Sequence, residues 1–194
     1  MRSDLNEFDF STVFLDRDGV LNKKMPEGMY VRSLEELEIL PGTAEAVRKL
    51  NQAGITVLVA SNQRGVALGC CTSDDVNAIH ERIQQHLSAA GAKIDRFYFC
   101  PHDKEKCLCR KPLTGMFERA RAEFPHIDGA RSAMIGDSLS DIQFGKRAGM
   151  YTLLIRAGEK SGASENENIA DRADATCSSL TEAVEHLLGL RNRT

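Results

Sequence analysis

Short apolar runs alternate regularly with longer segments of helical period, and this alternation constrains the fold more than any other feature. Five apolar runs predict buried strands at residues 11–16, 55–61, 96–100, 132–137 and 151–155. Segments of helical character predict helices at residues 41–54, 72–91, 115–124, 141–149 and 179–190. Strands that alternate with helices favour an α/β fold in which helices cover both faces of a parallel sheet.

The predicted elements fill the chain without a visible linker, which indicates a single domain over residues 1–194. Thr43 is the expected N-cap of the first helix, and Gly54 is expected just beyond its last turn. The one long polar stretch, residues 158–171, is expected to form an exposed loop.

Composition excludes several classes of protein. The 25 basic and 28 acidic residues give a net charge of −3, which argues against binding to nucleic acid. No run approaches the ~20 apolar residues of a membrane span, and the first twenty residues resemble no signal peptide. We therefore expect a cytosolic protein without a membrane or nucleic-acid partner. Nothing in the sequence fixes the oligomeric state, and a monomer is the default expectation.

Two carboxylates follow the first apolar run, in the stretch FLDRDGVLN. Asp16 and Asp18 are two residues apart, so their side chains would point the same way from an extended chain. In parallel α/β sheets the ligand crevice lies at the carboxyl ends of the strands. By itself the pair could equally form a solvated turn, because Asp and Gly are common turn residues.

Polar residues at the other predicted strand ends change this assessment. Ser61, Asn62 and Gln63 end the second strand, Asp137 ends the fourth, and Asp141 follows four residues later. Lys111 lies between these segments in the sequence. Several carboxylates at one sheet edge repel each other unless a cation holds them together, and such hard oxygen ligands suit Mg²⁺.

The order DxDG, SN, KP and GDxxxD, spanning residues 16 to 141, resembles the haloacid dehalogenase (HAD) superfamily of phosphohydrolases. The resemblance implies a HAD-like Rossmannoid fold. No long insertion separates Asp18 from the helix predicted at 41–54, so we expect no large cap and a mostly open site.

The resemblance also implies catalytic roles that the chemistry supports. Asp16 would attack phosphorus to form an aspartyl-phosphate, and Asp18 would serve as general acid and then general base. Ser61 would donate a hydrogen bond to the transferring phosphoryl group, and Lys111 would neutralise its charge.

Further residues would bind the metal and the substrate. The expected Mg²⁺ ligands are Asp16, the backbone carbonyl of Asp18, and Asp137, with Asp141 orienting the site. The expected contacts to a small phosphorylated sugar are made by Asn62, Gln63, Arg64 and Arg110. Lys23, Lys24 and Arg64 are candidates for binding a distal phosphate.

A second group of residues lies just before Lys111, in the stretch CPHDKEKCLCRKP. Cys100, His102, Cys107 and Cys109 form the pattern C-x-H-x4-C-x-C, and four N/S ligands suit a closed, structural Zn²⁺ site. Such a site would fix the loop that carries Arg110 and Lys111. Free thiols with a surface histidine are the alternative, and Cys70, Cys71 and Cys177 are expected to be ordinary thiols.

Within the superfamily the motifs resemble two families, the D,D-heptose 1,7-bisphosphate phosphatases and the histidinol-phosphatases. The segments SNQRGVALG and CRKPLTGM favour the heptose family. The four-residue gap between His102 and Cys107 is nearer the histidinol type, and Ser138 stands where many heptose enzymes carry a lysine. A receiver-like phosphoacceptor domain and a non-catalytic zinc module are alternatives of a different class. In a receiver domain the phosphoacceptor lies on a later strand than the acidic pair and no zinc clip is present. A zinc module leaves the DxD, lysine and GDxxxD motifs unexplained.

Overall fold

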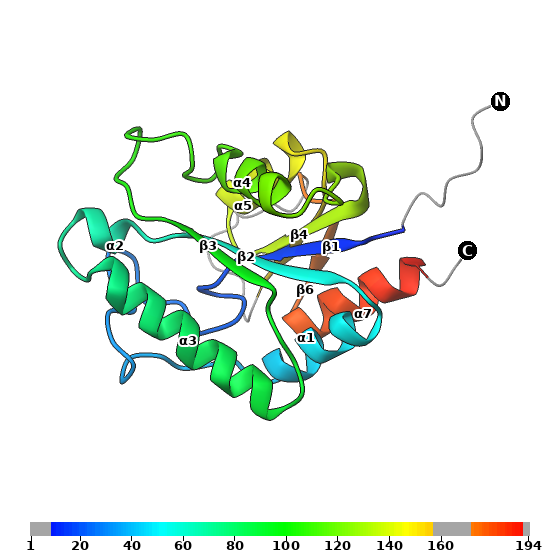
Figure 1. Ribbon diagram of the computed structural model, residues 1–194, viewed down its shortest axis with the longest axis horizontal. Coiled ribbons are helices and arrows are strands. Elements are labelled where there is room, and N and C mark those ends of the chain that lie inside the picture. Colours follow the sequence, from blue (N-terminus) through cyan, green and yellow to red (C-terminus); the bar gives the residue numbers. More distant parts are fainter. Residues whose placement is uncertain (1–8, 157–171, 192–194) are drawn as a thin grey trace.

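The computed structural model describes residues 9–156 and 172–191, which form one six-stranded parallel sheet flanked by helices (Figure 1). This confirms the predicted fold class. The predicted polar loop at 158–171 lies outside the described residues. No helix in the described ranges has both the length and the apolar character needed to cross a membrane.

The five predicted strands all form, and a sixth joins them at one edge. The strand order is β3-β2-β1-β4-β5-β6. The sixth strand has only three residues, too few for a recognisable apolar run. The strands are β1 (Thr12–Leu15), β2 (Thr56–Asn62), β3 (Arg96–Cys100), β4 (Ser132–Gly136), β5 (Tyr151–Ile155) and β6 (Ala175–Cys177).

The predicted helices also form, together with one short helix that the sequence did not indicate. That helix, α2, has a single turn, which is too short for a periodic pattern. The helices are α1 (Thr43–Gln52), α2 (Arg64–Ala67), α3 (Ser73–Ala89), α4 (Gly115–Glu123), α5 (Leu139–Arg147) and α7 (Leu180–Arg191), with a 3₁₀ turn at Gly129–Arg131.

The start of α1 corrects one expectation. Gly42, not Thr43, occupies the N-cap position, with a left-handed φ of 79°. The Thr43 hydroxyl instead donates to the Leu21 carbonyl at 3.1 Å, so it ties the helix to the loop after β1. Gly54 follows the C-cap residue Ala53 with a φ of 73°, as expected for a helix C-terminus.

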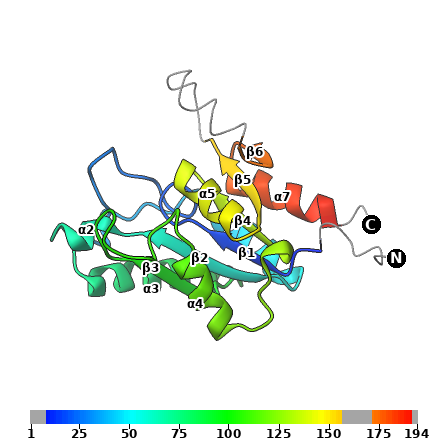
Figure 2. The same cartoon turned by 90° about the horizontal axis from the view of Figure 1, so that it is seen from above.

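The sheet separates two apolar layers because successive strand residues face opposite sides. Val13 and Leu15 of β1 pack in the layer that α1, α3 and α7 cover. Phe14 faces the other layer, where its ring meets Phe117 of α4 and Phe144 of α5 edge-on, with centroids 5.8 and 6.1 Å apart. Figure 2 shows α4 and α5 together on this second face.

The connections create a crevice beside the central strand β1. The chain runs from β1 outward through β2 and β3, and then crosses back to place β4 on the other side of β1. At such a reversal of strand order, the loops leaving neighbouring strands diverge, and ligands bind at the carboxyl ends. The last residues of β2 and the segments that follow β1 and β4 carry the predicted hydroxyl and acidic residues.

Candidate active site

A pocket of about 300 Å³ opens at the carboxyl ends of β1, β2 and β4. Its size is at the lower end of the range for small-molecule sites. Nine of the candidate site residues predicted from the sequence line it, namely Asp16, Asp18, Lys24, Ser61, Asn62, Arg110, Lys111, Asp137 and Asp141. Residues separated by more than a hundred positions therefore share one cavity.

Lys111 is the centre of this arrangement. Its side chain is almost fully buried, and Nζ lies 2.9 Å from Asp16 Oδ1 and 2.5 Å from Asp141 Oδ1. Nζ also donates to the carbonyl of Ala60 at 2.5 Å. Lys111 thus links the residue that follows β1 and the first turn of α5 to the end of β2.

Asn62 fixes the backbone of Lys111 at the end of β2. Its Nδ2 donates to the Lys111 carbonyl at 3.0 Å, and its Oδ1 accepts from the Lys111 amide at 2.9 Å. This reciprocal pair explains how the side chain of a separate loop can be held beside Asp16. Asn62 also lines the pocket, so it is placed to contact a substrate while it holds the Lys111 backbone.

The buried carboxylates carry more negative charge than the neighbouring ammonium groups neutralise. Burial raises the pKa of Asp16 to about 7, with Asp141, Asp137 and Asp18 adding to the rise and Lys111 opposing it. Burial and the Asp141 charge likewise raise the pKa of Asp137. Burial opposes the charge of Lys111, yet Asp141 and Asp16 raise its pKa above the ordinary value. The surplus negative charge favours a bound cation.

The acidic cluster fits a divalent cation with oxygen ligands. Carboxylate oxygens of Asp16, Asp137 and Asp141 lie within 4.8 Å of one another. Asp137 Oδ1 is buried and has no hydrogen-bond partner among the described residues, while Oδ2 accepts from Lys24 Nζ at 2.7 Å. A buried oxygen without a donor is costly, and a cation would satisfy it. Lys24, a candidate for a distal phosphate, is therefore placed at the acidic cluster.

Two glycines allow the acidic loops to approach each other. Gly19 has a φ of 92°, and a Cβ there would overlap the Asp137 carboxylate. At Gly136 a Cβ would overlap the side chain of Asp141. The Asp141 carboxylate also caps α5, because Oδ2 accepts from the amide and hydroxyl of Ser138 at 3.0 and 2.6 Å. Ser138 is thus the N-cap of α5, which starts at Leu139, two residues earlier than predicted.

Asp18 has a different environment from Asp16. Its carboxylate accepts hydrogen bonds from Arg17, from Asn22 Nδ2 at 2.9 Å and from Gln63 Nε2 at 2.9 Å. Burial alone would raise the pKa of Asp18, but the charge of Arg17 and these hydrogen bonds outweigh it and lower the pKa below the ordinary value. The two aspartates of the DxD motif are therefore electrostatically distinct.

The structure places three other predicted contacts outside the pocket lining. Gln63 is buried and bridges Asp18 to Ser61, whose Oγ accepts at 2.7 Å. Arg64 pairs with Asp103 of the cysteine-containing loop at 2.5 Å, and Lys23 pairs with Glu38 at 2.9 Å. Residues 25–31 form one wall of the pocket, a placement that was not predicted from the sequence.

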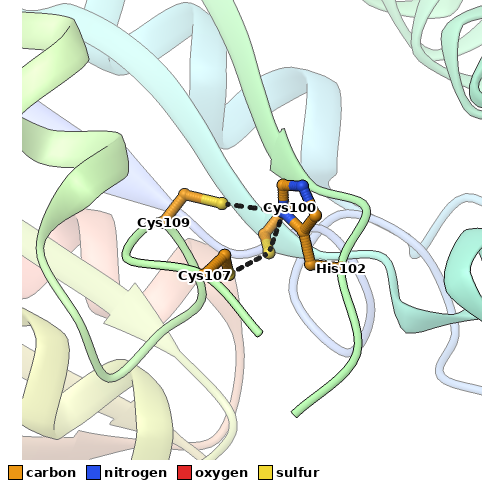
Figure 3. A group of neighbouring side chains, drawn as sticks. All are labelled: Cys100, His102, Cys107 and Cys109. Carbon is orange, nitrogen blue, oxygen red and sulfur yellow. Dashed lines mark hydrogen bonds between the residues drawn. The ribbon is translucent and has the colours of Figure 1, made fainter. Parts of the chain in front are cut away.

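The four residues of the second motif come together in the loop after β3. Sγ of Cys100 lies 3.4 Å from Sγ of Cys107 and 3.6 Å from Nδ1 of His102, which is 3.3 Å from Sγ of Cys109 (Figure 3). Zn–S and Zn–N bonds of about 2.3 and 2.0 Å at tetrahedral angles separate neighbouring ligand atoms by roughly 3.5–3.8 Å. The cluster thus fits one tetrahedral ion, and the motif's prediction that these side chains meet is confirmed.

Comparisons with known proteins agree with this geometry. The HAD-hydrolase-like family matches residues 108–183. A D-glycero-D-manno-heptose-1,7-bisphosphate 7-phosphatase of Thermosynechococcus vestitus is 39% identical, over 89% of this chain and 93% of its own. A D-glycero-alpha-D-manno-heptose-1,7-bisphosphate 7-phosphatase of Mycobacterium tuberculosis is 37% identical, over 92% and 94%.

A solved structure also resembles the chain. The D,D-heptose 1,7-bisphosphate phosphatase of B. bronchiseptica, crystallised with magnesium and phosphate, superposes with a TM-score of 0.80. It is 32% identical, and the match covers 93% of this chain and 99% of that one. Phosphatase relatives over nearly the whole length leave no room for a receiver domain or a non-catalytic zinc module. The chain belongs to the HAD phosphatases, in the family of the D-glycero-D-manno-heptose-1,7-bisphosphate 7-phosphatases.

Proposed function

We propose that this chain removes the 7-phosphate of D-glycero-D-manno-heptose 1,7-bisphosphate and leaves the 1-phosphate in place. The observation that carries the proposal is the single pocket that gathers Asp16, Ser61, Lys111 and Asp137, in a chain 39% identical to an enzyme of that name. We further propose that it acts as a single-domain cytosolic monomer.

The first chemical step uses Asp16 as the nucleophile. A carboxylate oxygen of Asp16 attacks phosphorus, the bond to the sugar oxygen breaks, and the leaving oxygen takes a proton from Asp18. Asp18 acquires that proton when the phosphate binds, because a nearby anion raises the pKa of a carboxyl group. The buried ammonium of Lys111, 2.9 Å from Asp16 Oδ1, is placed to neutralise the phosphoryl charge.

The second step restores the enzyme. Asp18, now ionised, takes a proton from water, the water oxygen attacks phosphorus, and the bond to Asp16 breaks to release phosphate. Mg²⁺ held by Asp16, Asp137 and the Asp18 carbonyl would neutralise charge that develops on the phosphoryl oxygens in both steps. Ser61 and Lys111 hold the phosphoryl group throughout.

The substrate assignment is tested by comparing kcat/KM for the two heptose 1,7-bisphosphate anomers with that for histidinol phosphate. Arg110 lines the pocket, and its NH1 is buried without a hydrogen-bond partner among the described residues. A distal phosphate would pair with it, whereas the imidazole of histidinol phosphate would not. We expect kcat/KM for the preferred heptose anomer to exceed kcat/KM for histidinol phosphate by at least ~100-fold. Faster turnover of histidinol phosphate, or a product that keeps its 7-phosphate by ³¹P NMR, would overturn the assignment.

We also propose that Cys100, His102, Cys107 and Cys109 hold a structural Zn²⁺. Four protein ligands leave no open position for water, which is typical of structural rather than catalytic zinc. The Cys109 ligand is directly followed by Arg110 and Lys111, so the ion would fix the loop that delivers both cations to the pocket. The Asn62 contacts hold the same loop from the other side.

Replacement of one zinc ligand should reveal this role. We expect Cys107→Ser to reduce bound zinc from one per chain to nearly none and to lower kcat/KM by ~10-fold or more, because metal binding and local folding are coupled. Metal content is measured by plasma mass spectrometry on the purified protein. Cys70→Ser is the matched control, since Cys70 is exposed and lies outside the cluster. Wild-type protein purified with zinc supplied, yet free of it, would refute the proposal.

A further inference from the structure

One buried charge beside the pocket has no role in the chemistry described so far. Arg17, the residue between the two aspartates, is fully buried. Its Nε and NH2 donate to Asp18 Oδ1 at 3.2 and 2.9 Å, and NH2 also donates to Oδ2 at 2.9 Å. The planar guanidinium thus donates hydrogen bonds to both oxygens of the Asp18 carboxylate in a bidentate contact, which a lysine could not form.

A gain in stability is weak grounds for placing an ion pair at this position. Arg17 NH1 is buried without a hydrogen-bond partner among the described residues, so part of the desolvation cost is uncompensated. Replacing both members of a buried ion pair by apolar side chains is often neutral or stabilising, whereas removing Arg17 alone would leave Asp18 without its cation and lower stability. The Arg17 carbonyl, not its side chain, accepts the backbone hydrogen bonds of the turn, from Leu21 at 2.8 Å and Asn22 at 3.1 Å.

The donors to Asp18 act from behind the pocket. Asp18 lines the pocket, whereas Arg17, Asn22 and Gln63 do not. Asn22 Nδ2 donates to Oδ1 and Gln63 Nε2 donates to Oδ2, each at 2.9 Å, so each carboxylate oxygen accepts from one amide as well as from Arg17. Gln63 also donates to Ser61 Oγ at 2.7 Å, which couples Asp18 to the phosphate-binding hydroxyl. Arg17 donates its side-chain hydrogen bonds to Asp18 and does not line the pocket, so it acts on the reaction through Asp18.

We propose that Arg17 is a positioning residue for the reaction: its bidentate contact fixes the Asp18 carboxylate in the orientation from which it exchanges protons with the leaving oxygen and with water. This inference rests on the proposed acid–base role of Asp18. The new element is that Arg17, the residue before Asp18, orients the Asp18 carboxylate. Asn22 and Gln63 donate to the same carboxylate and help to hold it. Because Arg17 does not reach the pocket, its loss changes kcat and leaves KM nearly unchanged.

The test compares two leaving groups in Arg17→Met. A sugar alkoxide needs a proton to leave, whereas the nitrophenolate of p-nitrophenyl phosphate leaves without one. In rapid-mixing experiments we expect the first step with the heptose bisphosphate to slow at least ~10-fold, as part of the 10²–10⁴-fold that acid–base catalysis supplies. The nitrophenolate burst should keep its rate within about threefold, and KM should change less than about twofold. A purely structural role would slow both substrates equally.

Three further variants keep the outcome decisive. Asp18→Asn should show the same split between leaving groups. If it does not, the acid–base role fails and the proposal fails with it. If it does and Arg17→Met slows both substrates alike or neither, only the Arg17 proposal is overturned.

Arg17→Lys preserves the charge, so its rate of the first step should fall between those of wild type and Arg17→Met. The same variant provides the test if Arg17→Met does not fold. Arg32→Met is the matched control, because Arg32 pairs with Glu36 outside the pocket lining.

Discussion

Asp16→Asn is expected to lower hydrolysis of the heptose bisphosphate by at least ~10⁴-fold, because an amide cannot replace the carboxylate that attacks phosphorus. The same variant should form no phosphorylated enzyme, whereas acid-quenched wild type should carry an acyl-phosphate that intact-mass measurement detects. Hydrolysis is measured as phosphate release under saturating Mg²⁺. Asp9→Asn, the same change in an exposed ion pair with Arg131, should leave both readouts unchanged.

The stability of Asp16→Asn shows whether its activity is lost because the nucleophile is missing or because the variant does not fold. Burial raises the pKa of Asp16 to about 7 from 3.8, so the protonated carboxyl favours the folded state. That contribution is complete below pH 3.8 and is lost as the pH rises through about 7. Asparagine stays neutral, so in EDTA at pH 8 the variant should unfold at the same or a higher urea concentration than wild type. Retained hydrolysis in this well-folded variant would remove Asp16 from the role of nucleophile.

Lys111→Met is expected to lower both activity and stability. Removing one preorganised charge that stabilises a transition state costs ~10²–10³-fold in kcat. A further loss follows because Lys111 is the group that opposes the raised pKa of Asp16. Without the ammonium that pKa rises above about 7, and the nucleophile is protonated at neutral pH. The combined loss should be at least ~10³-fold, measured as kcat/KM across pH 6 to 9.

The stability effect of Lys111→Met follows from its two buried partners. Asp16 and Asp141 would be left without the ammonium that lies 2.9 and 2.5 Å from their oxygens. Breaking a buried ion pair in this way costs about 3–5 kcal/mol, which urea unfolding in EDTA measures directly. Lys23→Met is the control, because Lys23 forms an exposed pair with Glu38 and should change stability by less than ~1 kcal/mol. Activity within about threefold of wild type in Lys111→Met would contradict the central place given to this lysine.

Local patterns were sufficient wherever one segment carries its own signal. The apolar runs specified β1, β2, β4 and β5 because a strand buried on both faces needs an uninterrupted apolar stretch. The aromatic run RFYFC specified β3, a partly buried strand at the edge of the sheet. The DxD and GDxxxD motifs indicated Asp16 and Asp137 because parallel strands end at a common edge. A short spacing lets several side chains reach one metal ion. The sequence therefore indicated a cluster of Cys100, His102, Cys107 and Cys109.

Features that depend on partners from distant segments could not be predicted in this way. β6 has three residues and is a strand only because β5 lies beside it. Thr43 matched an N-cap by type, but the Leu21 carbonyl, 22 residues away, takes its hydroxyl and Gly42 caps the helix instead. Arg64 resembled a phosphate ligand, yet Asp103 of a separate loop pairs with it.

The sequence alone indicated the class of fold, the carboxylates that we propose to react and the residues of the two candidate metal clusters, because each depends on the chemistry and spacing of nearby residues. Tertiary structure decided how those groups differ from one another. Asp16 is buried against Asp141 and Asp137 and its pKa is raised, whereas Asp18, two residues on, is held by Arg17, Asn22 and Gln63 and its pKa is lowered. Burial and the field of surrounding charges set these properties, and both arise only when distant segments pack together.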